Sequence, residues 1–261
     1  MSEDTLLHSI GDDGIAVVTL NRPQLHNAFD DELIARLTTL FHELGGRDDV
    51  RVVLLAANGK SFSAGADLNW MRRMADYNEE ENYQDAMRLA DMLRTLNELP
   101  KPTIALVQGA AFGGGVGLVA CCDIVLAAPR ATFSLSEVKL GIIPAVISPY
   151  VVSAIGPRMA RRYLLTAERF DAEEGRRIGL VHEVVEPDSL RERAGEIAAA
   201  LLGNGPNAIR ECKALINAVA RGPIDDAMIE DTAQRIARIR ASEEGKEGLG
   251  AFLEKRKPGW I

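Results

Sequence analysis

Glu137 is the carboxylate whose surroundings best suit proton transfer. It stands in the segment 133–144, which reads FSLSEVKLGIIP and is largely apolar. A carboxylate partly removed from water has a raised pKa, which suits a group that takes and returns a proton. Two other interpretations stay open: Ser134 and Glu137 have the spacing of a helix capping box, and Lys139 could pair with the carboxylate. The segment therefore indicates a proton shuttle or a helix start.

Three successive glycines, Gly113, Gly114 and Gly115, follow a predicted strand and open an apolar helix. Glycine allows a close approach to the backbone, and the first amides of a helix point unused donors outward, so this run could bind an anion or a developing oxyanion. The alternative is a tight strand-to-helix turn. A dinucleotide fingerprint fits poorly, because Gly117 is followed by Ala120 and no ribose-binding acid is suitably placed.

A second small-residue loop, Ala64-Gly65-Ala66-Asp67, also follows a predicted strand. Two such loops could present two amide N–H groups to one oxygen, and losing one such donor costs roughly 3–4 kcal/mol of barrier. Asp67 is also expected to cap the helix that begins at Leu68. The two loops together suggest an oxyanion site with Glu137 as its acid.

The spacing of the histidines gives little support for a metal site or for a nucleophilic triad. The histidines, at positions 8, 26, 42 and 182, lack metal-ligand spacing, and no Ser-His-Asp order stands out. We expect no metal and no separate cofactor. The cysteines, at positions 121, 122 and 212, do not form a disulfide framework and are expected to be reduced core residues.

Charge and composition limit the partners. The formal net charge is −8, which argues against nucleic-acid binding because that requires a dense basic surface. The N-terminus MSEDTLLHSI lacks a signal-peptide pattern, and no apolar run is long enough to span a bilayer. We expect a cytoplasmic enzyme that meets any anionic ligand with local cations.

Strands alternate with helices along the first two thirds of the chain. The predicted strands are 15–20, 51–57, 103–108 and 124–128, and the predicted helices are 30–44, 79–99 and 116–122. The last helix is apolar on every side and should be buried. This order predicts repeated β-β-α or β-α units with helices over the sheets.

Beyond about Pro187 the strand signals stop. Residues 190–216 and 223–252 read as amphipathic helices without a sheet of their own. Such a helical tail often packs on a neighbouring subunit, so we expect an oligomer. We assign residues 1–195 to the core with the active site and residues 196–261 to a helical oligomerisation region.

Together these segments, in this order, resemble the crotonase (enoyl-CoA hydratase/isomerase) superfamily over nearly the whole chain. The motifs that carry the resemblance are SAGAD at 63–67, AFGGG at 111–115, CDI at 122–124, SEVKLG at 136–141 and FLEKRK at 252–257. The resemblance implies an α/β fold, a spiral of β-β-α units with a C-terminal helical trimerisation region, in a homotrimer or a dimer of trimers.

The resemblance also implies roles for individual residues. The thioester oxygen of an acyl-CoA substrate would lie between the N–H groups of Ala66 and Gly114. Coenzyme A, as part of that substrate, would follow Leu25, His26 and Ala28, with its adenine near Ala64, Ala66 and Asp67. Lys255 or Lys257 would supply cations for its phosphates, across a subunit boundary in one arrangement.

One position departs from the family pattern. Hydratases of this family usually carry two glutamates that hold the attacking water, and the position of the first is Gly117 here. Only Glu137 remains, which favours a double-bond isomerase. In contrast, the stretches LVACCD at 118–123 and PAVISPY at 144–150 look most like the bacterial methylglutaconyl-CoA hydratase branch of leucine degradation.

Three functions are therefore weighed. The first is hydration of an enoyl-CoA, or its reverse, with 3-methylglutaconyl-CoA as the favoured substrate; there Arg72, Arg73 or Lys139 could face a distal carboxylate. The second is double-bond isomerisation by Glu137 alone. The third is a CoA-binding scaffold whose site has decayed, as Gly117 suggests.

Overall fold

The computed structural model describes residues 4–220 and 222–261. Within these residues the larger sheet has six strands in the order β1-β2-β3-β5-β7-β10. β1 and β2 form an antiparallel hairpin at one edge, and the remaining neighbours pair in parallel. The strands are β1 Leu6–Ile10, β2 Ile15–Leu20, β3 Val52–Ala57, β5 Thr103–Val107, β7 Ile124–Ala127 and β10 Glu183–Val184.

A smaller sheet has the order β4-β6-β8-β9, in which only β9 is antiparallel. Its strands are β4 Ser61–Ser63, β6 Ala110–Phe112, β8 Thr132–Ser134 and β9 Phe170–Asp171. Each of β3, β5 and β7 is followed by a strand of this smaller sheet and then by a helical segment: α2 (Leu68–Ala75), α4 (Gly114–Cys121) or α5 (Ser148–Thr166). The predicted spiral of β-β-α units is confirmed.

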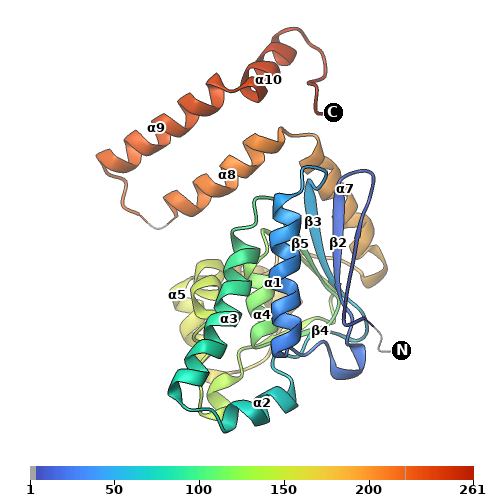
Figure 1. Cartoon of the computed structure of the whole chain (residues 1–261), viewed down its shortest axis with the longest axis vertical. Helices are drawn as coiled ribbons and strands as arrows, with labels where there is room; N and C mark the ends of the chain where they lie inside the picture. Colours follow the sequence, from blue (N-terminus) through green and yellow to red (C-terminus); the bar gives the residue numbers. More distant parts are fainter. Residues whose placement is uncertain (1–3, 221) are drawn as a thin grey trace.

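Alternate residues of the central strands face two different apolar layers. Val53 and Leu55 pack in the cluster that contains α1 (Asp31–Gly46) and α3 (Glu79–Asn97), whereas Val52 and Leu54 pack with α7 (Leu190–Leu202). α1 and α7 thus cover opposite faces of the larger sheet (Figure 1). Burial on both faces explains why the sequence of β3 is a continuous apolar run rather than an alternation of apolar and polar residues.

The predicted buried helix is α4, from Gly114 to Cys121, in which nearly every side chain is buried. Cys121 and Cys122 lie in the core, and burial raises the pKa of the Cys122 thiol to about 12. Cys212 lies on α8 and is exposed, so its prediction as a core residue was wrong. It lies within an amphipathic helix, and sequence alone does not show which face that helix buries.

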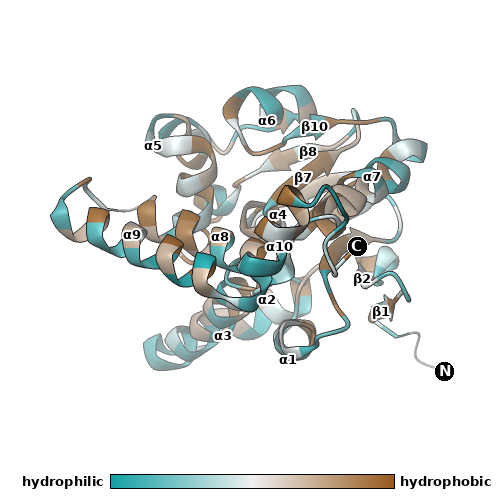
Figure 2. Cartoon of the chain, turned by 90° about the horizontal axis from the view of Figure 1, so that it is seen from above, coloured by the Kyte–Doolittle hydropathy of each residue, from teal (hydrophilic) through white to brown (hydrophobic). Residues whose placement is uncertain are grey.

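The C-terminal helices α8 (Pro206–Val219), α9 (Asp226–Ala241) and α10 (Glu243–Leu253) form an arm that extends beyond the sheets (Figure 1). α8 and α9 bury no side chain, and α10 buries only Ala251. An ion pair of 2.8 Å between Lys213 and Asp123 ties α8 to the start of β7. Apolar and polar residues are mixed along the projecting α9 (Figure 2).

The C-terminal helices end and begin at other residues than the sequence predicted. The predicted stretch 190–216 is divided into α7 and α8, and 223–252 is divided at Ser242, which ends α9 and caps α10. The boundary proposed at residue 195 falls inside α7, a helix that packs on the larger sheet. α6 (Ala172–Ile178) and the short helices η1 (Pro23–Leu25), η2 (Glu137–Leu140) and η3 (Pro187–Ser189) complete the described elements.

Candidate active site

Three loops leave the same edge of the smaller sheet. β4, β6 and β8 are adjacent and parallel, so their carboxyl ends lie side by side. Ala64–Asp67 follows β4, Gly113 and Gly114 follow β6, and Glu137 comes three residues after β8. The carboxyl edge of parallel strands is where α/β proteins commonly place their ligands.

Gly65 and Gly113 are in close contact. A Cβ added at Gly65 would lie 3.0 Å from the carbonyl oxygen of Phe112 and 3.9 Å from the Cα of Gly113. Both glycines have positive φ, +88° and +50°, a region that side chains disfavour. The two small-residue loops predicted to converge are therefore adjacent, and glycine is needed at both points of contact.

Ala66 is held with its N–H turned away from its neighbouring segment. It forms an isolated parallel bridge with Phe29: the Phe29 N–H donates to Gly65 O at 2.7 Å, and the Asp67 N–H donates to Phe29 O at 2.6 Å. On this side of the parallel bridge the bonds use Gly65 O and Asp67 N–H, the groups before and after Ala66, and leave the N–H of Ala66 itself unused. The Ala66 N–H is therefore available to a ligand.

Gly114 offers the second N–H because it is the first residue of α4, where amides have no intrahelical acceptor. The preceding Gly113 N–H donates to Ser134 O at 2.9 Å, which fixes this turn to the end of β8. A Cβ at Gly114 would lie 2.8 Å from Cε2 of Phe29, so a larger residue would displace that ring. Glycine here keeps the backbone accessible and the packing close.

Glu137 points toward the second glycine turn. Its Oε1 lies 3.0 Å from the position that a Cβ of Gly113 would occupy, and its Oε2 is buried without a hydrogen-bond partner among the described residues. Burial raises the pKa of the Glu137 carboxyl, although its own backbone N–H partly offsets that effect. A half-buried carboxylate with one unpaired oxygen, beside the turn at Gly113, can hold and move a proton.

Both structural interpretations of Glu137 were wrong. Ser134 donates to Ala167 O rather than capping a helix, and the short helix η2 that Glu137 opens has no side-chain cap. Lys139 is exposed, and no ion pair joins it to Glu137 in the described structure. Neither a helix cap nor an ion pair with Lys139 therefore explains the position of the carboxylate.

The segment expected to follow coenzyme A lies beside the first loop. The Ala64 N–H donates to His26 O at 2.9 Å, and His26 Nδ1 lies 3.0 Å from the Ser61 hydroxyl. Leu25 and His26 are exposed, whereas Ala28 is buried. His26 and Ala64 are therefore adjacent, and the path of coenzyme A along Leu25, His26 and Ala28 stays a prediction.

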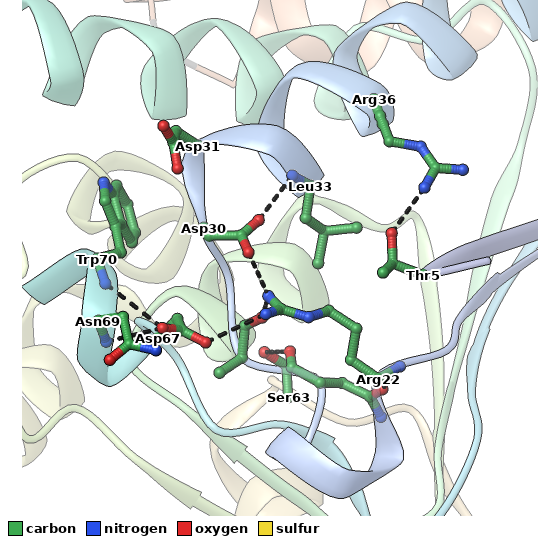
Figure 3. A network of polar contacts seen from close by, with 12 residues as sticks. Thr5, Arg22, Asp30, Asp31, Leu33, Arg36, Ser63, Asp67, Asn69 and Trp70 are labelled. Atoms are coloured by element: carbon green, nitrogen blue, oxygen red, sulfur yellow. Dashed lines mark hydrogen bonds and ion pairs between the residues drawn. The ribbon is translucent and has the colours of Figure 1, made fainter. Parts of the chain in front are cut away.

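Asp67 has a structural role. Its carboxylate accepts from the N–H groups of Asn69 and Trp70 at the start of α2, as the sequence predicted, and pairs with Arg22 at 3.2 Å (Figure 3). Its side chain is buried, so the expected proximity to adenine stays a prediction. Arg22 is 45 residues from Asp67 in the sequence, and no local pattern indicates this contact.

Gly117 lies inside α4 and faces apolar side chains. A Cβ at this position would lie 2.5 Å from Cγ2 of Ile147 and 3.5 Å from Cδ2 of Leu93. The space that a second carboxylate would need is occupied by Ile147, which is 3% exposed. Gly117 therefore contributes close packing between α4 and α5.

Lys255 and Lys257 are not brought to this site within one chain. They are exposed and follow α10, which lies at the opposite end of the molecule from α2 (Figure 1). Among residues 4–220 and 222–261, no group of three or more His, Cys, Asp or Glu side chains is arranged to hold a metal ion. None of the described helices is both long and apolar enough to cross a membrane.

The fold and the paired glycine turns define a crotonase-type enzyme, and comparisons with known proteins agree. The profile of the enoyl-CoA hydratase/isomerase family matches residues 11–261. The short-chain-enoyl-CoA hydratase of Clostridium acetobutylicum is 36% identical over 93% of this chain and 92% of its own length. The chain belongs to the enoyl-CoA hydratase/isomerase family.

Solved structures give the same result. An enoyl-CoA hydratase from Shewanella pealeana superposes with a TM-score of 0.96 at 49% identity, covering 98% of this chain and 96% of that one. Pseudomonas aeruginosa AtuE superposes with a TM-score of 0.94 at 37% identity, covering 98% and 99%. Activity of the enoyl-CoA hydratase/isomerase type follows from this membership.

Proposed function

We propose that the chain adds water to an enoyl-CoA thioester, or removes it in the reverse direction. The observation that carries the proposal is the buried, unpartnered Oε2 of Glu137 beside the adjoining turns at Gly65 and Gly113. An acid in this position reaches the reacting carbons of a thioester whose carbonyl oxygen accepts from Ala66 and Gly114. The named hydratases among the relatives support the reaction class.

In the proposed mechanism, Glu137 orients a water molecule and takes one of its protons as the water oxygen bonds to the β-carbon. Electron density moves through the double bond to the thioester oxygen, where the N–H groups of Ala66 and Gly114 stabilise the enolate. Glu137 then returns its proton to the α-carbon. The net change is the addition of one water molecule, and the carboxylate ends in its starting state.

Coenzyme A would lie along Leu25, His26 and Ala28, with its adenine near Ala64, Ala66 and Asp67. Lys255 or Lys257 would reach its phosphates from a second copy, because α10 extends away from its own site. A homotrimer or a dimer of trimers would bring such a residue close. The apolar side chains exposed on the arm support an assembly of this kind.

The favoured substrate is 3-methylglutaconyl-CoA, an intermediate of leucine degradation. Its support is the resemblance of 118–123 and 144–150 to that branch of the family. The distal carboxylate would need a cation: Arg73 already pairs with Asp31, so Arg72 and Lys139 are the better candidates. Arg72 donates only to Asn69 and has no acidic partner among the described residues.

Turnover of two thioesters tests this proposal. Purified protein is incubated with 3-methylglutaconyl-CoA and with crotonyl-CoA while the enoyl absorbance is followed, and each assay is repeated with Arg72→Met and Lys139→Met. Removal of a cation that binds the distal carboxylate should raise KM for 3-methylglutaconyl-CoA and leave KM for crotonyl-CoA unchanged. No turnover of any enoyl-CoA tested would reject hydration.

Isomerisation is the second candidate, and the observation that favours it is Ile147 in the space beside Gly117. A site with one carboxylate suffices to move a proton from one carbon to another. Labelled water separates the two reactions: a hydratase incorporates solvent oxygen into a hydroxyacyl product, whereas an isomerase converts a 3-enoyl thioester without it.

A further inference from the structure

We propose that Arg22 is a positioning residue that sets the direction of the Ala66 N–H, by joining the starts of the two helices, α1 and α2, that follow the bridge between Phe29 and Ala66. This inference rests on the proposed function, in which that N–H stabilises the thioester enolate. Arg22 does not touch the reacting atoms in this proposal. It acts through the backbone that it holds.

The guanidinium of Arg22 contacts three acceptors from two separate segments. One nitrogen donates to Ala28 O at 2.9 Å and pairs with Asp30 at 2.7 Å, and the other pairs with Asp67 at 3.2 Å (Figure 3). The Arg22 side chain is only 11% exposed. A planar fork with several fixed donors can satisfy all three acceptors together, whereas a lysine presents a single point charge.

Each of the two carboxylates already caps a helix. Asp30 accepts from Leu33 N at 2.8 Å at the start of α1, and Asp67 accepts from Asn69 N at 2.8 Å at the start of α2 (Figure 3). Arg22 therefore fixes the distance between two helix N-termini. Phe29 precedes one cap and Ala66 precedes the other, so the bridge between Phe29 and Ala66 lies directly beside this ion-pair network.

The backbone of Arg22 is anchored as firmly as its side chain. Its N–H donates to Asn27 Oδ1 at 2.7 Å, and its carbonyl accepts from the Asn27 N–H at 2.9 Å. Asn27 is fully buried and donates to Asn58 O and Ser61 O, each at 2.9 Å. The guanidinium thus extends from a fixed base, which a positioning residue requires.

Removing the guanidinium would leave two carboxylates facing one another without their cation. Like charges at short distance repel, and the two helix starts would separate or rotate. A misplacement of about 1 Å in a catalytic group can lower a rate by about 100-fold. The Ala66 N–H would be displaced most, because Ala66 directly precedes the Asp67 cap and is bridged to Phe29, which directly precedes the Asp30 cap.

The test compares Arg22→Met and Arg22→Lys with the matched control Arg36→Met. Arg36 also links α1 to a second segment, through Thr5 and Asp4, but it does not contact the loop at 64–67 (Figure 3). Steady-state turnover of an enoyl-CoA gives kcat and KM, and amide hydrogen exchange of the peptide that spans 60–70 reports the loop without depending on turnover.

We expect Arg22→Met to lower kcat about 10- to 100-fold with KM changed less than about threefold, because a displaced oxyanion donor is felt mainly in the transition state. Exchange at 64–67 should become faster. Arg22→Lys should recover part of kcat, and Arg36→Met should leave both measurements at the wild-type values. A kcat for folded Arg22→Met within twofold of wild type, with unchanged exchange, would overturn the inference.

Asp30→Asn guards against a variant that fails to fold. Asparagine still accepts from the Leu33 N–H but loses the charge that pairs with Arg22. It should lower kcat in the same direction as Arg22→Met, and no change in kcat or in exchange would count against the inference. If the wild-type protein turns over no enoyl-CoA, the proposed function fails, while the exchange measurements still decide whether Arg22 holds the loop.

Discussion

The site edge of the smaller sheet and the C-terminal arm differ in how far they bury their apolar side chains. At the site edge, Phe29, Phe62 and Phe133 are almost fully buried, and the loops are fixed by hydrogen bonds at each turn. On the arm, α8 and α9 bury nothing, and Phe252 and Leu253 are 79% and 78% exposed. One region buries its large apolar side chains within a single chain, and the other leaves them exposed.

This difference suggests that the core supplies the stability of the chain and that the arm is the region available for association. Burying one large apolar side chain stabilises by roughly 1.5–3 kcal/mol, so the arm keeps several such contributions unrealised in a single chain. The core places Glu137 beside the turn at Gly113 within a single chain. Substitutions at the site should therefore act on chemistry, and substitutions on the arm should act on association.

The largest effect is expected from Glu137→Gln. It keeps the shape of the side chain but removes the group that moves the proton, so kcat should fall by about 10²- to 10⁴-fold. Steady-state turnover and circular dichroism are the measurements, and the spectrum should not change. A variant that binds acyl-CoA and whose turnover matches the wild type would favour the scaffold interpretation.

Gly65→Ala should damage the site through the backbone. At φ +88° a Cβ is strained by about 1–3 kcal/mol, and it would also press on Phe112 O at 3.0 Å. We expect a lower melting temperature and a kcat lowered by about 100-fold through displacement of the Ala66 N–H. Gly46→Ala is the control, because a Cβ there meets nothing within 4 Å and should change stability by less than about 1 kcal/mol.

The pH profile should show the burial of Glu137. Its pKa is raised by desolvation, and the ionised form is the base, so kcat/KM should rise with pH through a value above the ordinary glutamate pKa of about 4.3. The raised pKa also means that folding favours the protonated form. Wild-type stability relative to Glu137→Gln should therefore fall as pH rises through the folded pKa, which thermal melts from pH 4 to 8 would measure.

The arm should respond to Ile236→Asp. Ile229 and Ile236 are seven residues apart on one face of α9 and are 57% and 47% exposed, so a charge there should weaken association. Gln234→Asp adds the same charge at a polar position and serves as the control. Sedimentation equilibrium gives the mass of each, and equal masses for wild type and Ile236→Asp would contradict an assembly through this face.

Sequence patterns predicted the long elements well and the short ones poorly. The strand at 51–57 and the buried helix at 116–122 correspond to β3 and α4, because their apolar residues decide burial locally. The three-residue strands β4, β6 and β8 have no periodicity to detect. The glycine turns at Gly65 and Gly113 and the acid Glu137 were nevertheless recognisable in the sequence. The order of these groups along the chain was therefore predictable, although the smaller sheet that positions them was not.

The supporting residues of the site were not predictable in the same way. Arg22 reaches Asp67 across 45 positions, and Ile147 fills the space beside Gly117 across 30. Neither contact follows from spacing within one element, since both depend on how separate units pack. Local patterns therefore identified which groups could react, while the tertiary structure was needed to find what holds them.

The contact between Gly117 and Ile147 also constrains how this protein could change by mutation. Any side chain introduced at 117 meets a branched residue whose Cγ2 lies 2.5 Å from the new Cβ. A smaller residue at 147 would have to come first, or both changes together, before an acid could be accommodated on α4. The order of substitutions is thus restricted: an acid at 117 needs an earlier or a simultaneous reduction of the side chain at 147, and an earlier reduction leaves a cavity beside α4.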